Sequence, residues 1–540
     1  MTTLDVLYSG GPILTLVGDS PTYVECLGVS DGRIAYAGPA DGAEVSSTTQ
    51  RVDLAGAALL PAFYDAHGHL IAAAHQLEQA WLRGEKVPSI PSLIEALRAK
   101  AAERPLEPGD WIVGAGWHAA VLEEQRPPTA DELDAVSTEH PVIAIHASGH
   151  TCSVNHKALE LAGFTPGCPE MPGGVIHRVE GTDIPNGYLE EAPLFHMRSL
   201  MAPTKPSRYV ELVSAAMLDW AANGFTTAQE DVLGSGAPDD IPMLSAAADA
   251  GLLMELLVYA EPKHYDAALA AFPGSDADYV KGVRTRGVKL FLDGSLGGQT
   301  AWTTEPYAGR DSSDAGCCGV PTSSPEVLAE IFERFYDSDV QIQAHQNGDR
   351  AVDQFLEAVA AARVVHGDLD KRPIAIHAQL VRPEQWQQMR ELGVVPSLYP
   401  TALSAQGDIV AMAVPDRLEW FNAARTALES GIRFSAHNDA PLVPMSGVAL
   451  LDGLVNRRTE SRAQVAPEQR IGMHDALKSI TVWAAYQHFE DDVKGTLEVG
   501  KYADLVVLDR DPLTVNPEEI LGVRVLETIR RGTTIFQVAR

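Results

Sequence analysis

Short apolar runs alternate with amphipathic stretches along most of the chain, and their order predicts a barrel of parallel strands. Each apolar run leads toward a segment whose apolar residues recur with helical spacing. We expect strands at residues 58–66, 225–231, 252–260, 286–292, 340–345, 373–377, 393–399 and 432–438. Helical spacing is clearest over residues 207–222, 325–337, 350–364, 417–430 and 473–485. These β/α units predict an α/β fold of the TIM-like (β/α)8 barrel type, whose active site forms at the carboxyl ends of the strands.

Both ends of the chain show strand patterns without intervening helices. Residues 1–60 hold short strand patterns broken by turns, of which Asp31-Gly32 is typical of a hairpin. Residues 489–540 repeat this style after the barrel. Because each end is too short to bury a core alone, we expect both ends to form one small β-sandwich.

The interval from about residue 75 to about residue 205 separates the first two predicted barrel strands. It is too long for a simple connection between a strand and a helix. It also carries strand patterns of its own, at residues 111–114 and 141–146. We therefore expect an insertion subdomain, able to overhang the active site, within a barrel domain that spans residues 61–488.

Composition narrows the class of protein further. At 540 residues and 45% hydrophobic content, the chain suits a large catalytic domain with an accessory one. A formal net charge of −32 argues against nucleic acid and membrane surfaces as partners. The cysteines, including the adjacent pair Cys317 and Cys318, are few and irregularly spaced, which is typical of reduced structural thiols. We expect a cytoplasmic protein that acts on a small molecule, with a homodimer as a candidate assembly.

Histidine, lysine and aspartate recur where predicted barrel strands end. The first strand leads into His67-Gly68-His69, and side chains two apart on a strand point the same way, so both imidazoles can face one metal ion. Taken alone, such a pair is equally consistent with two packed histidines. Later strand ends add Lys289, His345, His377 and Asp439. Core packing alone would not be expected to place all these residues at strand ends. Imidazole and carboxylate groups together suit zinc or a similar divalent ion.

Lys289 has an unusual setting for a lysine. It lies among the apolar residues Val288, Leu290 and Phe291, so desolvation should make its amine less basic and more reactive. The alternative interpretation is a lysine that pairs with Asp293 or extends to the surface.

The motifs that carry these residues resemble those of the amidohydrolase superfamily, in the amidohydrolase-3 branch that includes N-substituted formamide deformylases. The resemblance runs from the turn at residues 29–34, through the strand-end motifs, to residues 495–504. It implies a metal-dependent hydrolase of an amide-type C–N bond, with N-substituted formamides or small N-acyl amines as first substrates. Hydrolysis of a cyclic amide, carbamate or ester is the alternative. A non-catalytic scaffold is disfavoured because every expected ligand position is filled.

The resemblance also implies a role for each strand-end residue. His67 and His69 would bind one of two divalent ions, most simply zinc, with manganese or iron as alternatives. Two further histidines would bind the second ion, and a carboxylated lysine would bridge both ions (His345, His377 and Lys289). Asp439 would lie near the first ion and act as general base and then general acid. The rival interpretation is a mononuclear site with an unmodified lysine.

Other residues are candidate substrate contacts or supports. The insertion segment Ser148-Gly149-His150 matches the deformylase-like subgroup, so His150 is a candidate contact, with a backbone-bonded loop histidine as the alternative. Three aromatic residues suit an uncharged, partly apolar substrate, with packing of the insertion against the barrel as the alternative role, namely Trp117, Trp302 and Tyr399. His437 lies two residues before Asp439, so we expect it to support the site without binding metal.

Overall fold

The computed structural model describes residues 4–82, 87–119, 121–147, 150–201, 206–234, 240–274, 279–310, 313 and 316–539. The chain divides into two compact units. The first, here called the barrel unit, comprises Met1–Ala72 and Val213–Arg540, and the second, the insertion unit, comprises Ala73–Leu212. Among the described residues, no helix has both the length and the apolar character that a membrane crossing requires.

A parallel sheet forms the centre of the barrel unit, and its strands neighbour one another in the order of the sequence. The strands are β8 (Phe63–Tyr64), β15 (Phe225–Leu233), β16 (Glu255–Ala260), β17 (Val283–Phe291), β18 (Gln341–Gln346), β19 (Ile374–His377), β20 (Val395–Leu398) and β21 (Ser435–Ala436). Nearly every residue in them is buried, as expected for a parallel sheet covered on both faces. The predicted strands therefore occur in the predicted order.

One predicted strand proves to be two. The apolar run at residues 58–66 is interrupted at Ala62, whose backbone N–H donates to the carbonyl of Asp504. The segment before it, β7 (Ala58–Pro61), pairs with strands from the chain termini, whereas β8 pairs with β15. The chain passes from one sheet to another at Ala62. The sequence shows no boundary between the two strands, because both are buried and therefore both are apolar.

The central sheet curls until its edge strands, β8 and β21, meet at their carboxyl ends. The ring centroids of His67, which follows β8, and His437, which follows β21, are 4.8 Å apart. The backbone N–H of His69 also donates to the carbonyl of Ala440 at 2.8 Å. This curvature is consistent with a TIM-like barrel and brings all the strand ends to one mouth.

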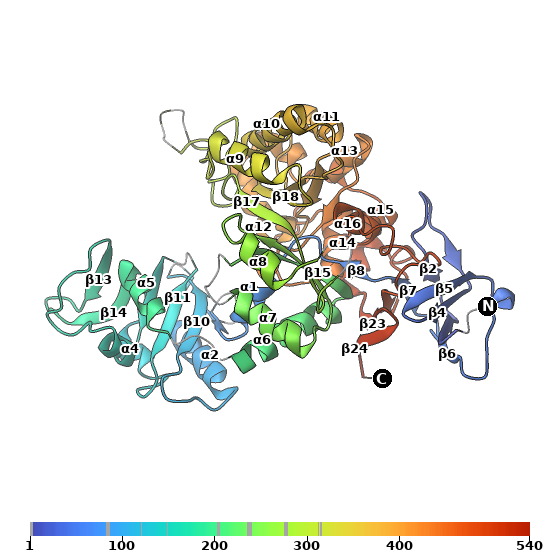
Figure 1. The fold of residues 1–540 in the computed structure, drawn as a ribbon. Helices are drawn as coiled ribbons and strands as arrows, with labels where there is room; N and C mark the ends of the chain where they lie inside the picture. The colour runs from blue at the N-terminus through green and yellow to red at the C-terminus, as the bar shows by residue number, and fades with distance from the viewer. Residues whose placement is uncertain are drawn as a thin grey trace. The chain divides into compact units, whose positions relative to one another are not determined.

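Helices follow the strands and cover the outside of the sheet, as Figure 1 shows for α9, α10 and α11 near β17 and β18. In α9, the side chain of Ser324 caps the first turn. The helix buries one face, which consists of Leu328, Phe332 and Phe335. The helices of the barrel unit are α7 (Asp240–Ala250), α8 (Tyr265–Ala271), α9 (Pro325–Phe335), α10 (Asp349–His366), α11 (Pro383–Leu392), α12 (Ala402–Ala413), α13 (Ala424–Glu429), α14 (Gly447–Val455), α15 (Met473–Ser479) and α16 (Val482–Gln487). Two more helices, α1 (Leu70–Gln76) and α6 (Pro206–Ala222), span the boundaries between the units.

Two of the predicted helices are shorter than their apolar spacing suggests. The predicted helix at residues 473–485 is broken at Thr481, whose backbone leaves the helical region and whose hydroxyl donates to the carbonyl of Leu477. The predicted helix at residues 417–430 is a 3-10 turn at Pro415–Trp420 followed by α13. In both places the helical spacing of apolar residues continues across a point where the backbone leaves the helical conformation.

Two further sheets of the barrel unit are built from the chain ends. One contains β5 (Arg33–Gly38), β4 (Cys26–Ser30), β1 (Val6–Ser9) and β6 (Gln50–Asp53). The other contains β24 (Thr533–Gln537), β23 (Val525–Arg530), β22 (Leu505–Leu508), β7, β2 (Ile13–Leu14) and β3 (Tyr23–Val24). Side chains from both sheets share one hydrophobic cluster, which joins Leu27 and Val29 to Leu59 and Leu505. Both chain termini therefore contribute strands to a common core.

The insertion unit is organised around a mixed sheet of its own. Its strands, in spatial order, are β13 (Gly174–Arg178), β14 (Pro185–Glu191), β12 (Thr151–Val154), β11 (Val142–His146), β10 (Ile112–Trp117) and β9 (Ala80–Trp81). Its helices are α2 (Ile90–Ala102), α3 (Ala130–Leu133), α4 (His156–Leu161) and α5 (Ala192–Ser199). Strands β10 and β11 coincide with the two strand patterns expected in the long interval.

Candidate metal centre and active site

His67 and His69 enter the mouth of the barrel from the loop after β8. Backbone bonds hold this loop, because the N–H of Asp231 donates to the Gly68 carbonyl at 3.0 Å. Glycine suits the position between the histidines, since a Cβ on Gly68 would lie 2.7 Å from Oδ2 of Asp65, an oxygen that accepts from the Trp220 ring at 2.8 Å. The two imidazole rings lie 5.3 Å apart and nearly perpendicular. The loop therefore presents both imidazoles to the barrel mouth, as the spacing predicted.

Asp439 approaches the same two histidines from the opposite edge of the sheet. Its Oδ1 lies 3.3 Å from Nε2 of His67 and 3.3 Å from Nε2 of His69. The backbone of Asp439 has a φ of 57°, which a non-glycine residue adopts only at a cost of about 1–3 kcal/mol. Strained backbone of this kind gathers at functional sites, where the surrounding structure holds it.

Buried polar atoms without hydrogen-bond partners converge in this region. Both ring nitrogens of His67 and Oδ1 of Asp439 are buried and make no hydrogen bond of regular geometry, although Nδ1 of His67 lies 2.6 Å from Oδ2 of Asp231. Leaving a buried polar group unpaired costs about 1–3 kcal/mol, so several at one point require an explanation. Ligand atoms of His67, His69 and Asp439 all lie within 4.8 Å of one another. Two imidazoles and a carboxylate in this arrangement fit a divalent metal ion.

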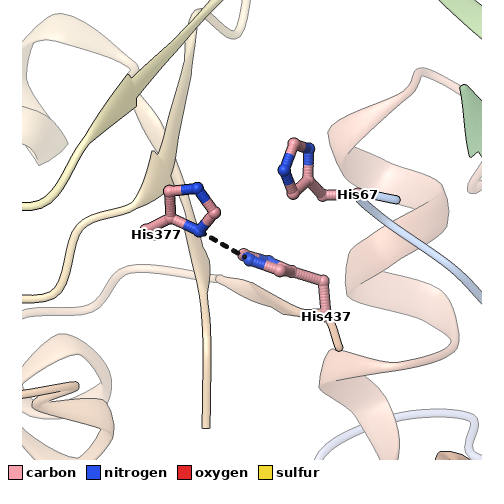
Figure 2. Close-up of side chains that lie close together, drawn as sticks. All are labelled: His67, His377 and His437. Carbon is pink, nitrogen blue, oxygen red and sulfur yellow. Dashed lines mark hydrogen bonds between the residues drawn. The ribbon is translucent and has the colours of Figure 1, made fainter. Parts of the chain in front are cut away.

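A second group of imidazoles overlaps the first at His67. Figure 2 shows His67, His377 and His437 gathered at one point. One ring nitrogen of each lies within 4.8 Å of the other two. His377 and Ala378 have positive φ angles of 69° and 43°, which turn the chain sharply where β19 ends. Nδ1 of His377 is hydrogen-bonded to Nε2 of His437 at 3.0 Å. Since Nδ1 of His437 contacts the Ser397 hydroxyl at 2.8 Å, both of its nitrogens are engaged, as a supporting residue requires.

Lys289 is buried on β17, and its partner is not the one expected. Its ammonium donates to Oδ2 of Asp231 at 2.6 Å, so the alternative pairing with Asp293 is wrong. Asp293 instead accepts backbone N–H bonds from Trp302, Asn347 and Gly348, which anchor the loops beside the site. These backbone donors satisfy the Asp293 carboxylate without Lys289.

Asp231 is the site residue that the sequence reasoning missed. Its Oδ2 lies 2.6 Å from both Nζ of Lys289 and Nδ1 of His67, at the end of β15. The amide of Gln343 also donates to its other oxygen. The signal was present, because Gln229-Glu230-Asp231 places polar residues at the end of an apolar strand, in the same pattern as the other site residues.

Electrostatics give the carboxylates and His345 the protonation states that metal ligands need, whereas at His67 burial and the charge of Lys289 are outweighed by the Asp231 carboxylate, which raises the pKa. The pKa of Asp439 lies well below its usual value, because burial alone would raise it but His377 and the neighbouring histidines outweigh burial. The charge of Lys289 likewise outweighs burial at Asp231 and lowers the pKa of that carboxyl. Burial and Lys289 lower the pKa of His345 to about 4. Ionised carboxylates and a neutral imidazole are the forms that bind divalent metals.

His345 lies at the edge of the cluster. Its ring centroid is 4.6 Å from that of His377, but it belongs to neither tight group of ligand atoms among the described residues. Its Nε2 contacts the Gly294 carbonyl at 3.1 Å and the Asn347 amide at 3.0 Å. These contacts engage only Nε2 of His345, so Nδ1 is the nitrogen that could bind a metal ion.

The candidate substrate contacts fall into both units. Tyr399 is buried beside the site, and its ring stacks on His437 with a centroid distance of 5.3 Å. Trp302 is half-buried on the loop that Asp293 anchors, and the Arg350 guanidinium lies over its ring. In the barrel unit, both aromatic residues therefore belong to segments at the strand ends.

Trp117 and His150 belong to the insertion unit. Trp117 is packed in the core of that unit and donates to the Ala144 carbonyl at 2.9 Å. His150 is exposed and pairs with Glu191 at 3.1 Å. The other two members of its motif, Ser148 and Gly149, lie outside the described residues.

Comparison with known proteins gives matches across nearly the whole chain. A profile described as the amidohydrolase family matches residues 50–536. YtcJ of Bacillus subtilis (strain 168), which is named as an amidohydrolase, is 26% identical over 554 residues, covering 99% of this chain and 100% of that protein. The N-substituted formamide deformylase of Arthrobacter pascens is 26% identical over 525 residues, covering 94% of each chain.

A solved structure agrees with these matches. An uncharacterised metal-dependent hydrolase from Pyrococcus furiosus superposes with a TM-score of 0.75 at 26% identity, covering 94% of this chain and 100% of the other. The fold, the convergent imidazoles and carboxylates, and the matched length all agree with the resemblance that the motifs suggested. The chain belongs to the amidohydrolase family.

Proposed function

We propose that this metal-dependent amidohydrolase cleaves an amide-type C–N bond in a small, uncharged and partly apolar molecule. N-substituted formamides and small N-acyl amines are the first candidates, and the similarity to an N-substituted formamide deformylase supports them. The observation that carries the proposal is the position of Asp439. Its buried Oδ1 lies 3.3 Å from two histidines, and its depressed pKa keeps the carboxylate ionised and therefore able to accept a proton.

Divalent metal would be held by imidazoles and by oxygen ligands at the strand ends. We assign His67 and His69 to one ion and His345 and His377 to a second, with a carboxylated Lys289 between them and Asp439 beside the first. When bound, zinc or a similar ion supplies a Lewis acid that polarises the scissile carbonyl and makes water a better nucleophile at neutral pH. Nε2 of His67, which is buried and makes no hydrogen bond of regular geometry, supports this assignment.

The residues around the metal centre then have distinct roles in proton transfer, in positioning and in binding the substrate. Oδ1 of Asp439 accepts a proton from the attacking water and returns it to the leaving amine nitrogen, as general base and then general acid. Asp231, whose Oδ2 lies 2.6 Å from Nζ of the unmodified lysine, would accept the single N–H that a carbamate leaves on that nitrogen. Tyr399 and Trp302 would line an apolar approach to the scissile bond.

We expect the purified protein to contain close to two divalent ions per chain and to lose activity when a chelator removes them. The reason is that the set of imidazoles and carboxylates exceeds what one ion needs. Elemental analysis of an active preparation tests this directly. A single bound ion would leave the hydrolase assignment but exclude a bridging lysine, and an active protein without tightly bound metal would refute the metal mechanism.

Product analysis tests the substrate class. We expect protein loaded with zinc or manganese to release an amine and a carboxylic acid from at least one N-substituted formamide or N-acyl amine. The panel should include lactams, carbamates and esters, because a ring-opened product or an alcohol would favour the alternative bond type. Matched dicarboxylate substrates serve as the control, and a preference for them would contradict an uncharged, partly apolar substrate.

A further inference from the structure

A continuous row of buried side chains crosses the barrel interior and ends at His377. It consists of Gln341, Tyr259, His488, Gln487, Ser435, Ser397 and His437, each almost completely buried. Their hydrogen bonds are not independent of one another, because each hydroxyl has one proton and each neutral imidazole has one N–H. The direction of every bond in the row can therefore be worked out from its fixed end.

The fixed end is the amide of Gln341. Its Nε2 donates to two backbone carbonyls, those of Arg372 at 2.7 Å and of Gln487 at 2.8 Å. Its Oε1 must therefore accept the Tyr259 hydroxyl, which lies 2.5 Å away. Because Tyr259 has then used its only proton, its oxygen accepts from Nδ1 of His488 at 2.9 Å.

The next amide continues the same direction. Since His488 carries its proton on Nδ1, its Nε2 accepts from Nε2 of Gln487 at 3.2 Å. A second contact fixes this amide independently, because Nε2 of Gln487 also donates to the Ala66 carbonyl at 3.1 Å. Oε1 of Gln487 is thus turned toward Ser435 and accepts its hydroxyl at 2.6 Å.

The serines carry the direction to the metal centre. Ser435 also lies in donating geometry toward Ser397 at 2.8 Å, but its one proton is taken by Oε1 of Gln487, which can only accept. Ser397 therefore supplies the proton of the contact between the two serines. Ser397 must then accept from Nδ1 of His437 at 2.8 Å. That leaves Nε2 of His437 as an acceptor, and the donor 3.0 Å away is Nδ1 of His377.

We infer that this row is a positioning device that holds His377 in the Nδ1–H tautomer. In that tautomer the lone pair on Nε2 is directed toward the candidate metal centre, where Oδ2 of Asp439 lies 4.0 Å away. Ligating histidines need their second nitrogen fixed by a partner, and loss of that partner lowers metal affinity about 10- to 100-fold. The inference rests on the proposed metal centre and adds Ser435, Ser397 and Gln487 as positioning residues.

Ser435→Ala tests the direction of the row. Without an acceptor beyond it, the Ser397 hydroxyl can donate to Nδ1 of His437, which then carries its proton on Nε2 and directs it at His377. His377 would be protonated on the nitrogen that faces the metal. We expect zinc affinity, measured by competition with a chromophoric chelator, to fall by about 10- to 100-fold.

Ser479→Ala is the matched control. Its hydroxyl is equally buried and donates to the Ala476 carbonyl at 2.7 Å, outside the row. It should lower thermal stability to a similar extent and leave zinc affinity unchanged. Equal zinc affinity in Ser435→Ala and Ser479→Ala would overturn the inference.

Neutron diffraction from metal-free, deuterium-exchanged wild-type crystals tests the inference even if Ser435→Ala does not fold. We expect deuterium on Nδ1 of both His377 and His437. Deuterium on Nε2 of His377 would overturn the inference. Neither measurement needs a substrate, so a protein that shows the expected zinc affinities and deuterium positions but hydrolyses no amide would refute only the proposed function.

Discussion

Asp439→Asn is expected to lower turnover at least about a hundredfold, which is the usual scale of general acid–base catalysis, while much of the bound metal is retained. Asparagine keeps the shape of the side chain and one oxygen ligand. It cannot accept a proton as the carboxylate does, and the depressed pKa of Asp439 shows that the ionised form is the resting state. Turnover and metal content of the same preparation measure the two effects separately.

Asp504→Asn is a matched control for this change. Asp504 is also buried, and its Oδ1 accepts the backbone N–H of Arg531 at 2.8 Å, in the sheet formed by the chain ends. Asparagine can keep that bond, so turnover should stay near the wild-type value. If Asp439→Asn with full metal also turned over at the wild-type rate, another group would move the proton, and His437 would be the next candidate.

Lys289→Ala is expected to lose one metal ion or both. Its activity should fall by more than about 10- to 100-fold, which is the loss typical when a residue that only supports a metal ligand is removed. A lysine cation would be repelled by two divalent ions, whereas its carbamate, formed when the neutral amine attacks carbon dioxide, is an anionic ligand for both. Small carboxylic acids should restore part of the activity by filling the position of the bridge. Elemental analysis and activity assays with added acetate measure both effects.

Lys289→Arg distinguishes a bridging ligand from a simple positive charge. Guanidinium keeps the charge that pairs with Asp231 but cannot form a carbamate, so this variant should remain inactive. Recovery of activity in Lys289→Arg would favour an unmodified lysine in a mononuclear site. Electron density that ends at Nζ of Lys289, in a crystal with both metals present and carbon dioxide available, would also contradict the carbamate.

The sequence alone determined the order of the barrel strands and most of the residues at their ends. Buried parallel strands are apolar on both faces, so they stand out as short runs, and polar residues just after them are conspicuous. His67, His69, His377 and Asp439 were recognisable for this reason. The boundary at Ala62 was not, because the apolar run 58–66 is buried in two different sheets.

Only the tertiary structure decided which of these residues act together. Lys289 pairs with Asp231, 58 positions earlier, and not with the nearby Asp293, because the curl of the sheet brings the two strand ends into contact. The row that ends at His377 depends on the same curvature, since the amide of Gln487 donates to the carbonyl of Ala66, 421 positions away. Local spacing shows which side chains share a strand face, but the partner of a buried polar group is set by the packing of distant segments.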